Sequence, residues 1–358
     1  MPTLPSLPSR HRARGFSLVE LMVASAIGLA ILAALSTMFV KNTRAQQEIE
    51  QAHRQVENGR YAIDLLTVDL RNAGYYAEFD PSVLASPAAL PALCAANLDG
   101  LKAGLVLPVQ GLDGGAAMPA CLADLRAGTD VLVVRRTATC VAGIGNCAAT
   151  SAGGPFFQAS LCNNATELDS PNVADFYALS LSTANLNRHG RDCSPTPASG
   201  TLADVRRYRT HIYYIANNNR AGDGIPTLKR LELGSTGTAP TWPAVPLAEG
   251  IENLQLEYGL DLAKDGVADL TAADPATANG CTDAACAVGN WRSAVAVRIH
   301  LLARNTQATP GYTDTKSYTL GLDADGEEHR IEPANDGYKR HVFQTQVELP
   351  NPAGRRLP

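Results

Sequence analysis

The sequence predicts an α+β protein in which one long N-terminal helix packs on an antiparallel β-sheet. Three observations predict this fold class. An apolar run of 25 residues, 16–40, follows a short basic segment. An apolar stripe with helical spacing then continues to about residue 73. Beyond residue 200 several runs alternate apolar and polar residues without a helical period, which is typical of strands in an antiparallel sheet.

The overall composition is that of a folded protein and not of a nucleic-acid-binding one. The chain has 358 residues, of which 45% are hydrophobic and 18% are charged, so it is too apolar to be disordered. Its formal net charge is −5. A nucleic-acid footprint needs a basic face, so we expect no nucleic-acid partner.

The N-terminus combines a basic segment with a long apolar one. Residues 1–15 are rich in Pro and Ser and carry four basic side chains, namely Arg10, His11, Arg12 and Arg14. Such a segment is an export or insertion signal whose positive end stays in the cytoplasm. A secretory signal could be cleaved after Ala24-Ser25-Ala26. The apolar run nevertheless continues to Val40, which makes roughly 37 Å of helix, enough to span a membrane.

Glu20 interrupts this apolar run near its start. A charged side chain at the centre of a bilayer costs at least about 2.5 kcal/mol, so an intramembrane carboxylate is a functional candidate by default. A plain signal peptide does not need the second half of the apolar run, and a plain membrane anchor does not need Glu20.

The stretch Gly15–Glu20, GFSLVE, with basic residues before it and about twenty apolar residues after it, resembles the type IV prepilin signature. The resemblance implies that a prepilin peptidase removes residues 1–15 as a leader, cutting between Gly15 and Phe16, and methylates the new amine of Phe16. It also implies that Glu20 is an assembly residue, which pairs with the N-terminal amine of a neighbouring subunit. Two charges that are costly alone in hydrocarbon would then set the axial register of the subunits.

Residues 41–75 continue the helix in amphipathic form. Apolar residues recur every seven positions at Ile49, Val56, Ile63 and Leu70, with Ala52, Gly59, Leu66 and Ala73 three positions further on. Four heptads are few for a coiled coil, and the second set of positions is mostly Ala and Gly. We therefore expect this apolar face of the helix to pack on a β-sheet. We expect a single helix from about Phe16 to Ala73 that ends at Gly74.

Four further runs resemble the PilW-type minor pilins. They are VENGRYA at residues 56–62, DLRNAGYY at 69–76, EGIENLQLEYG at 249–259 and RHVF at 340–343. The resemblance implies a type IV pilin-like fold, in which residues 16–40 form a transmembrane and assembly helix and residues 41–75 pack on the globular domain.

Residues 76–200 resemble nothing known to us, and we expect a variable insertion there. This segment is rich in Ala, Pro and Gly and holds six of the eight cysteines. Strand-like runs occur at Gly104–Val109, Thr129–Arg135 and Tyr177–Ser182. Variable loops on a rigid scaffold often carry function, so a system-specific surface is expected here.

The cysteines favour disulfides formed in an oxidising compartment. They form no C-x-x-C pair and all follow the apolar run, at Cys94, Cys121, Cys140, Cys147, Cys162, Cys193, Cys281 and Cys286. The sequence does not fix their connectivity, and several could instead be buried free thiols. Our hypothesis pairs sequence neighbours, 94 with 121, 140 with 147, 162 with 193, and 281 with 286.

Residues 201–358 contain the clearest strands, which we expect to form the antiparallel sheet of the globular domain. Candidate strands are Val205–Ala216 and Pro226–Leu233, which are separated by a Gly-Asp-Gly turn. Three alternating runs, at 253–260, 295–301 and 343–349, indicate half-buried strands.

The sequence contains no P-loop, H-E-x-x-H or G-x-S-x-G motif, and its seven histidines are scattered. We therefore expect no catalytic residue, cofactor or metal. Two acidic turns, Asp261–Asp269 and Asp323–Glu332, are candidate calcium loops. The first lacks a closing glutamate and the second has Gly321 at the first ligand position, so solvated turns are favoured.

The resemblance implies a minor pilin of a type IV pilus that acts in assembly, priming and tip structure and supports adhesion and twitching motility. The implied partners are the prepilin peptidase, the major pilin and other minor pilins, the inner-membrane assembly platform and a tip adhesin. The implied location is the inner membrane, single-pass with a cytoplasmic N-terminus, and then the pilus on the cell surface. The globular domain would be periplasmic or extracellular.

Two alternatives remain open from the sequence. A minor pseudopilin of a type II secretion system shares Phe16, Glu20 and the long helix. An enzyme or toxin domain tethered by a pilin-like anchor would instead place its activity in residues 76–200, where it predicts a clustered polar pocket.

Overall fold

The computed structural model describes residues 15–114, 119–194, 202–236 and 239–356. The chain forms two compact units that divide between Ala52 and His53. Helix α1, Leu18–Arg71, contributes residues 18–52 to the first unit and residues 53–71 to the second. The single long helix expected from the apolar run and the amphipathic stripe is therefore confirmed, with each end within two residues of the expected one.

The described part of the first unit is helical from Leu18 onward, and four of its hydroxyl side chains are satisfied locally. Four hydroxyl groups donate hydrogen bonds to carbonyl oxygens one turn earlier in the helix, those of Ser25, Ser36, Thr37 and Thr43. Such bonds let hydroxyl side chains lie in an apolar environment without unpaired donors. Among the described residues, α1 is the one helix that is long and apolar enough to cross a membrane.

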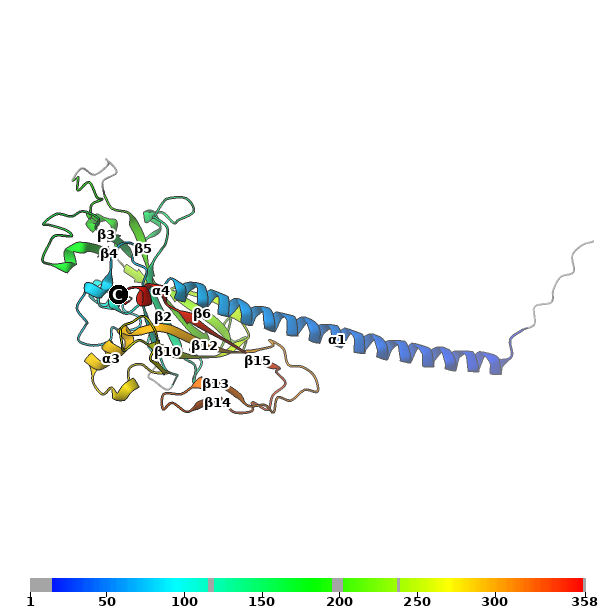
Figure 1. The fold of residues 1–358 in the computed structure, drawn as a ribbon. Helices are drawn as coiled ribbons and strands as arrows, with labels where there is room; N and C mark the ends of the chain where they lie inside the picture. Colours follow the sequence, from blue (N-terminus) through cyan, green and yellow to red (C-terminus); the bar gives the residue numbers. More distant parts are fainter. Residues whose placement is uncertain (1–14, 115–118, 195–201, 237–238, 357–358) are drawn as a thin grey trace, which may run out of the picture. The chain divides into compact units, whose positions relative to one another are not determined.

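The second unit contains a seven-stranded antiparallel sheet (Figure 1). Its main path runs β1, β2, β5, β3, β4, and β6 pairs with β5 while β9 pairs with β6. The bounds are Val109–Leu112 for β1, Val131–Thr137 for β2, Phe156–Ala159 for β3, Tyr177–Ser180 for β4, Val205–Ala216 for β5, Thr227–Glu232 for β6 and Ala244–Glu249 for β9. The twelve-residue β5 is central because β2, β3 and β6 all pair with it.

A second antiparallel sheet has the order β11, β10, β12, β15. Its strands are β10 at Ile251–Leu260, β11 at Leu270–Ala272, β12 at Ala294–Arg304 and β15 at Arg340–Glu348. Two small hairpins complete the strands, β7 (Gly234–Thr236) with β8 (Ala239–Thr241) and β13 (Tyr318–Leu322) with β14 (Glu328–Ile331).

Short helices lie in the connections between strands. The α-helices are α2 at Leu98–Ala103, α3 at Ala284–Arg292 and α4 at Pro350–Gly354. Asn97 caps α2 and Asp283 caps α3, each through its side-chain oxygen. Single 3-10 turns occur at Pro81–Val83, Gly104–Val106, Thr150–Ala152, Val173–Phe176, Thr183–Asn185 and Ala278–Gly280.

The main hydrophobic core joins the second half of α1 to both sheets. Ala62, Leu66 and Leu70 of the helix are fully buried and belong to one cluster with residues of β2, β5, β10 and β12. A second cluster is aromatic, since Tyr76, Phe79, Phe157, Tyr177 and Tyr208 pack together. The helical stripe expected from the sequence therefore covers sheet surface.

One expected strand is wrong. Residues 104–109 were expected to be extended, but Gly104–Val106 forms a 3-10 turn that continues from α2, and β1 begins only at Val109. The reason is tertiary packing. The Arg135 side chain lies so close to Gly104 that a Cβ there would be 2.8 Å from its Nε, and this contact is invisible in the local pattern.

Strand β10 also differs from its expectation as a half-buried strand, because all ten of its residues are buried. The face opposite the core carries Glu257, which accepts a hydrogen bond from His300 of β12 at 3.0 Å. The segment that contains β13 covers this face. Leu320 is fully buried, and a Cβ on Gly321 would lie 2.7 Å from the His300 ring.

Strands on either side of the expected boundary at residue 200 share one sheet, because β5 pairs with β2 and β3. Four disulfides close loops in the second unit, and no cysteine is free. They join Cys94 to Cys121, Cys140 to Cys147, Cys162 to Cys193 and Cys281 to Cys286, the same neighbour pairs as in the sequence hypothesis.

The two acidic turns use their carboxylates internally. Asp261 is fully buried, accepts hydrogen bonds from the backbone of residues 264–266, and lies 3.4 Å from Arg356. Asp323 accepts bonds from the backbone N–H groups of Asp325 and Glu327, both at 3.0 Å. These carboxylates stabilise their own turns, and Asp261, which we expected to be solvated, is shielded from water.

Candidate assembly site

The start of α1 is built by the residues of the processing motif. Ser17 is the residue before the first helical position, and its N–H donates to Glu20 Oε2 at 2.9 Å. The Glu20 N–H in turn donates to Ser17 Oγ at 3.2 Å. This reciprocal pair is a capping box, in which two otherwise unpaired helix donors are satisfied. Glu20 therefore has a local structural role that our sequence interpretation missed, although the S-x-x-E spacing signals it.

The capping bond leaves Glu20 able to bind further donors. An ionised carboxylate has about four acceptor positions, and the Ser17 N–H occupies one of them. The bond also survives cleavage between Gly15 and Phe16, because the Ser17 N–H belongs to the next peptide bond. The geometry can therefore hold the helix start in one conformation while the carboxylate receives a second, intermolecular partner.

Gly15 and Phe16 have no structural task within the described residues. A Cβ added at Gly15 would meet nothing within 4 Å. Phe16 is 88% exposed. A requirement for glycine at this position would therefore have to come from a molecule that acts on the chain.

The apolar half of α1 exposes large side chains along its whole length. They are Phe16, Leu18, Val19, Leu21, Met22, Val23, Ile27, Leu29, Ile31, Leu32, Leu35, Met38, Phe39 and Val40, each at least 46% exposed. This much apolar surface needs lipid or other apolar helices around it.

In the second unit, Gly59 of the VENGRYA run and Gln55, the residue just before the run, fix α1 on the four-stranded sheet. The Phe343 ring of β15 packs on Gly59, where an added Cβ would lie 2.2 Å from the ring. The buried Gln55 side chain donates to the carbonyl oxygens of Ala303 at 2.7 Å and Lys339 at 3.0 Å. Glycine lets the helix approach β15 closely, and this contact explains why the VENGRYA run has a glycine at position 59.

The Asp69 carboxylate of the DLRNAGYY run fixes α1 on the other sheet. It accepts from Arg136 Nε at 2.6 Å, from the Tyr213 hydroxyl at 2.8 Å, and lies 2.7 Å from His211 Nδ1. Burial raises the pKa of Asp69, but the charges and hydrogen bonds of His211, Arg136 and Tyr213 outweigh it. The pKa therefore lies well below its usual value, and this carboxylate stays ionised.

The end of α1 is tied to the C-terminal helix. Gly74 has a φ of +71°, which only glycine adopts readily, and a Cβ there would lie 3.0 Å from Pro108. Asn351 donates to the Ala73 carbonyl at 3.1 Å, and Arg355 donates to the Gly74 carbonyl at 2.9 Å.

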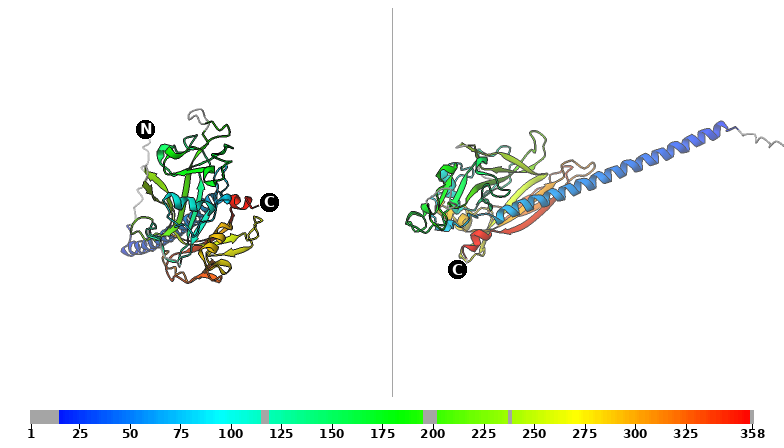
Figure 2. Two further views of the ribbon diagram at one scale, coloured as in Figure 1. Left: turned by 90° about the vertical axis from the view of Figure 1, so that its left-hand side faces the viewer. Right: turned by 90° about the horizontal axis from the view of Figure 1, so that it is seen from above.

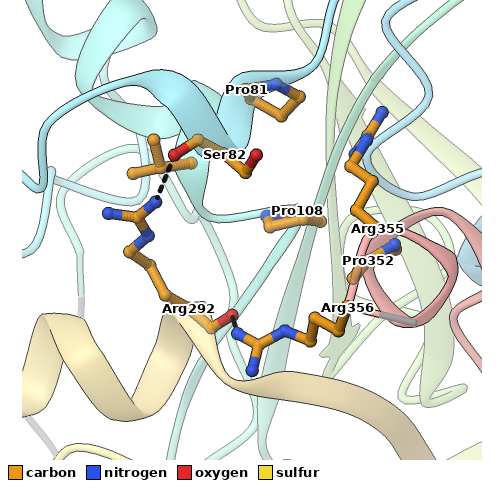
Figure 3. A pocket seen from close by; sticks show the side chains of 8 residues that line it. Pro81, Ser82, Pro108, Arg292, Pro352, Arg355 and Arg356 are labelled. Carbon is orange, nitrogen blue, oxygen red and sulfur yellow. Dashed lines mark hydrogen bonds between the residues drawn. The ribbon is translucent and has the colours of Figure 1, made fainter. Parts of the chain in front are cut away.

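A small pocket beside this junction is lined by three arginines (Figure 3). Its volume is about 70 Å³. Arg292 donates to the Ser82 carbonyl at 3.2 Å, Arg356 donates to the Arg292 carbonyl at 2.5 Å, and Arg355 lies 3.3 Å from an Asp80 oxygen. Because each guanidinium already has protein partners, we interpret the pocket as a structural junction.

Residues 76–200 contain a Ser, a Glu and a His in contact, but their arrangement is not that of a catalytic triad. Glu167 accepts from the Ser160 hydroxyl and contacts His189 Nδ1. In a triad the serine bonds to the imidazole, whereas here the serine and the histidine both bind the carboxylate. The group lies beside the Cys162–Cys193 disulfide and orders that loop.

Two family models match the chain. The model of the prokaryotic N-terminal methylation motif matches residues 10–36, and that of the type IV pilus-assembly protein W matches residues 212–351. The chain is a type IV prepilin-like protein that resembles the PilW-type minor pilins. The second match begins within β5 and ends within α4.

Four chains of solved structures match as well. One is a type IV-like pilin from Thermus thermophilus, with a TM-score of 0.35 and 13% sequence identity, covering 83% of this chain and 98% of that chain. No curated protein matches the chain.

The expected fold class is confirmed, since a long N-terminal helix, antiparallel sheets and disulfide-bonded loops make up a pilin-like α+β protein. The PilW-type match points to a structural protein of a type IV pilus and not to an enzyme. The methylation motif points to membrane anchoring followed by entry into a pilus.

Proposed function

We propose that this prepilin-like protein is a minor pilin that primes pilus assembly and is located near the pilus tip, where it supports adhesion and twitching motility. The observation that carries the proposal is the GFSLVE motif at the start of the exposed apolar half of α1, together with the PilW-type match. Its partners would be the prepilin peptidase, the major and other minor pilins, the inner-membrane assembly platform and a tip adhesin.

In the proposed mechanism, the positive leader holds the N-terminus in the cytoplasm while the globular unit enters the periplasm. The peptidase cuts between Gly15 and Phe16 and methylates the Phe16 amine. The capping box keeps the helix start ordered, and the Glu20 carboxylate pairs with the amine of a neighbouring subunit. Residues 16–40 then exchange lipid contacts for contacts with other pilin helices, and the apolar surface stays covered throughout.

The first test is the intact mass of the full chain after coexpression with a prepilin peptidase, for the wild type and for Gly15→Ala. We expect a wild-type product that begins at methylated Phe16 and a mutant that stays uncut. Because Gly15 contacts nothing in the described chain, the substitution leaves the fold unchanged. A product that begins at Ile27, or an uncut wild type, would contradict the proposal.

A minor pseudopilin of type II secretion remains the closest alternative, because it shares the processing motif. The match of residues 212–351 to the pilus-assembly family favours the pilus. Deletion of the gene should abolish twitching and leave protein secretion intact, whereas the opposite pattern would favour the pseudopilin.

A further inference from the structure

The outer edge of β15 is a regular, open strand edge. In its sheet β15 pairs with β12, and the register of the two strands runs without a bulge from Ala296↔Glu348 to Arg304↔Arg340. The Leu349 N–H donates to the Val295 carbonyl at 2.8 Å, and the Asn305 N–H donates to the Lys339 carbonyl at 3.1 Å. Hydrogen-bonded and non-hydrogen-bonded pairs alternate along an antiparallel ladder. Because residues 339 and 349 are hydrogen-bonded to β12 and its flank, the backbone N–H and C=O groups of the odd-numbered residues of β15 point toward β12.

The backbone groups of the even-numbered residues therefore point away from β12. Among the described residues, no backbone or side-chain hydrogen bond engages the N–H or C=O of Val342, Gln344 or Gln346. These residues form a row of donors and acceptors with the spacing of an extended chain.

The strands at the other ends of the two larger sheets are protected in ways that β15 is not. Strands β1, β4 and β11 have only three or four residues, and β9 contains Pro246 opposite a register irregularity. Short length, proline and irregular register are the usual means of blocking edge pairing. β15 has nine residues and no proline, and its middle, Val342–Val347, is uncharged.

A groove runs along this edge beside α1. It has a volume of about 450 Å³ and is lined by Arg60, Ile63, Asp64 and Thr67 of the helix and by Phe343, Gln344 and Thr345 of β15. The helix residues are spaced i, i+3, i+4 and i+7 and form one face. Figure 2 shows β15, in red, at the margin of the second unit (right-hand view).

We propose that the β15 edge binds an extended segment of another pilus subunit, which adds to the sheet as a fifth strand. The unpaired backbone row is complementary to one kind of partner, another extended backbone. Alternate side chains of the added strand would enter the groove, where Ile63 and Phe343 favour an apolar residue between the charges of Arg60 and Asp64. The segment is thus amphipathic. This inference rests on the proposed role in pilus assembly.

The test uses proline substitutions to remove backbone N–H groups of β15 that point away from β12. Gln344→Pro removes an N–H that faces away from β12, so the ladder to β12 is kept while strand addition is blocked. Gln344→Ala is the matched control, because it removes the side chain and keeps the N–H. Thermal unfolding of the purified full chain shows whether each variant is folded.

Binding is measured in cells that assemble the pilus, with the photo-crosslinking residue p-benzoylphenylalanine at position 346. The control position is Val267, which is 65% exposed and distant in sequence from β15. We expect crosslinks from 346 to one extended segment of a different pilus subunit and none to that segment from 267. Gln344→Pro should lower the crosslinked fraction about tenfold, the factor that about 1.4 kcal/mol gives, and Gln344→Ala should leave it unchanged.

Three outcomes would overturn the inference. They are the absence of crosslinks from 346, crosslinks that survive in a folded Gln344→Pro variant, and crosslinks only between two copies of this chain. If Gln344→Pro does not fold, Gln346→Pro with the crosslinker at 344 is used in its place. Processing is read from the same samples, and a chain that is cut at Phe16 but not crosslinked would reject only the strand addition.

Discussion

At the scale of single residues, Glu20 has a local task in the structure and an intermolecular task in the proposed function. Its capping bond to Ser17 fixes the helix start within the chain, and its negative charge is what a neighbouring amine would need. The two tasks depend on different properties of the side chain, namely hydrogen bonding and charge. They can therefore be separated by substitution.

We expect Glu20→Gln to keep the helix cap, since Gln also serves in capping boxes, and to be processed normally. Without the charge it should fail to enter pili. Ser17→Ala should show the reverse behaviour, with a helix start weakened by about 0.5–2 kcal/mol and assembly retained. Intact mass shows whether each variant is processed, the amount of protein in sheared pili measures assembly, and thermal unfolding followed by circular dichroism measures the helix start. Normal pilus entry of Glu20→Gln would exclude the pairing.

Gly59 is a second residue whose identity is explained by a specific contact. In an exposed helix, Gly→Ala would stabilise by about 1 kcal/mol. Here the new Cβ would lie 2.2 Å from the Phe343 ring, and overpacking costs typically about 1–3 kcal/mol. We therefore expect Gly59→Ala to lower the free energy of unfolding.

The same substitution in a Phe343→Ala background should be neutral or stabilising, because the opposing ring is gone. Chemical unfolding of the four proteins of this double-mutant cycle measures the coupling. Equal effects of Gly59→Ala in both backgrounds would mean that the ring does not set the need for glycine.

At the scale of elements, the contact between α1 and the seven-stranded sheet depends on ionised carboxylates. The pKa of Asp69 is lowered, as described above. At Glu232 of β6, burial raises the pKa, but the positive charges of His211, 3.7 Å away, and of Arg209 and Arg230 bring it from 4.5 to about 2. A lowered pKa means that the folded chain binds the proton less well than the unfolded chain.

These groups stabilise the fold fully above their ordinary pKa values near 4, and the stabilisation is lost as the pH falls toward 2. We expect the free energy of unfolding to decrease between pH 5 and pH 2, and Asp69→Asn to reduce this slope. Urea unfolding at a series of pH values measures it. An unchanged slope in the variant would show that Asp69 does not carry the effect.

The disulfides should differ in how much they contribute to the free energy of unfolding, according to the length of the loop that each one closes. Cys162–Cys193 spans 31 residues and Cys281–Cys286 spans 5. Loop-closure entropy gives about 4 kcal/mol for the first and about 2 kcal/mol for the second. Double Cys→Ala variants of each pair, compared by urea unfolding, should follow this order, and the reverse order would show that local packing outweighs the entropy.

At the scale of the whole molecule, the parts visible in the sequence are those with local periodicity. The long helix follows from its apolar spacing, and β5 follows from the run at 205–216 with the same bounds. The 3-10 turn at Gly104–Val106 and the burial of both faces of β10 do not follow, because both involve contacts with residues distant in the sequence, Arg135 for the turn and Leu320 for the strand. At the candidate site, the motif residues are evident in the sequence. The open edge of β15 needs the strand order, which no local pattern contains.

The contact between Gly59 and Phe343 has a consequence for how the protein matures. Gln55 binds the carbonyl of a residue 284 positions further along the chain, and β15 closes over the same part of α1. The helix therefore leaves the ribosome well before its docking surface. In the proposed export route, a membrane-bound precursor would therefore keep this face of the helix uncovered until β15 has also crossed the membrane. Folding would then follow translocation, and holdase chaperones on the far side of the membrane would meet the chain in that interval.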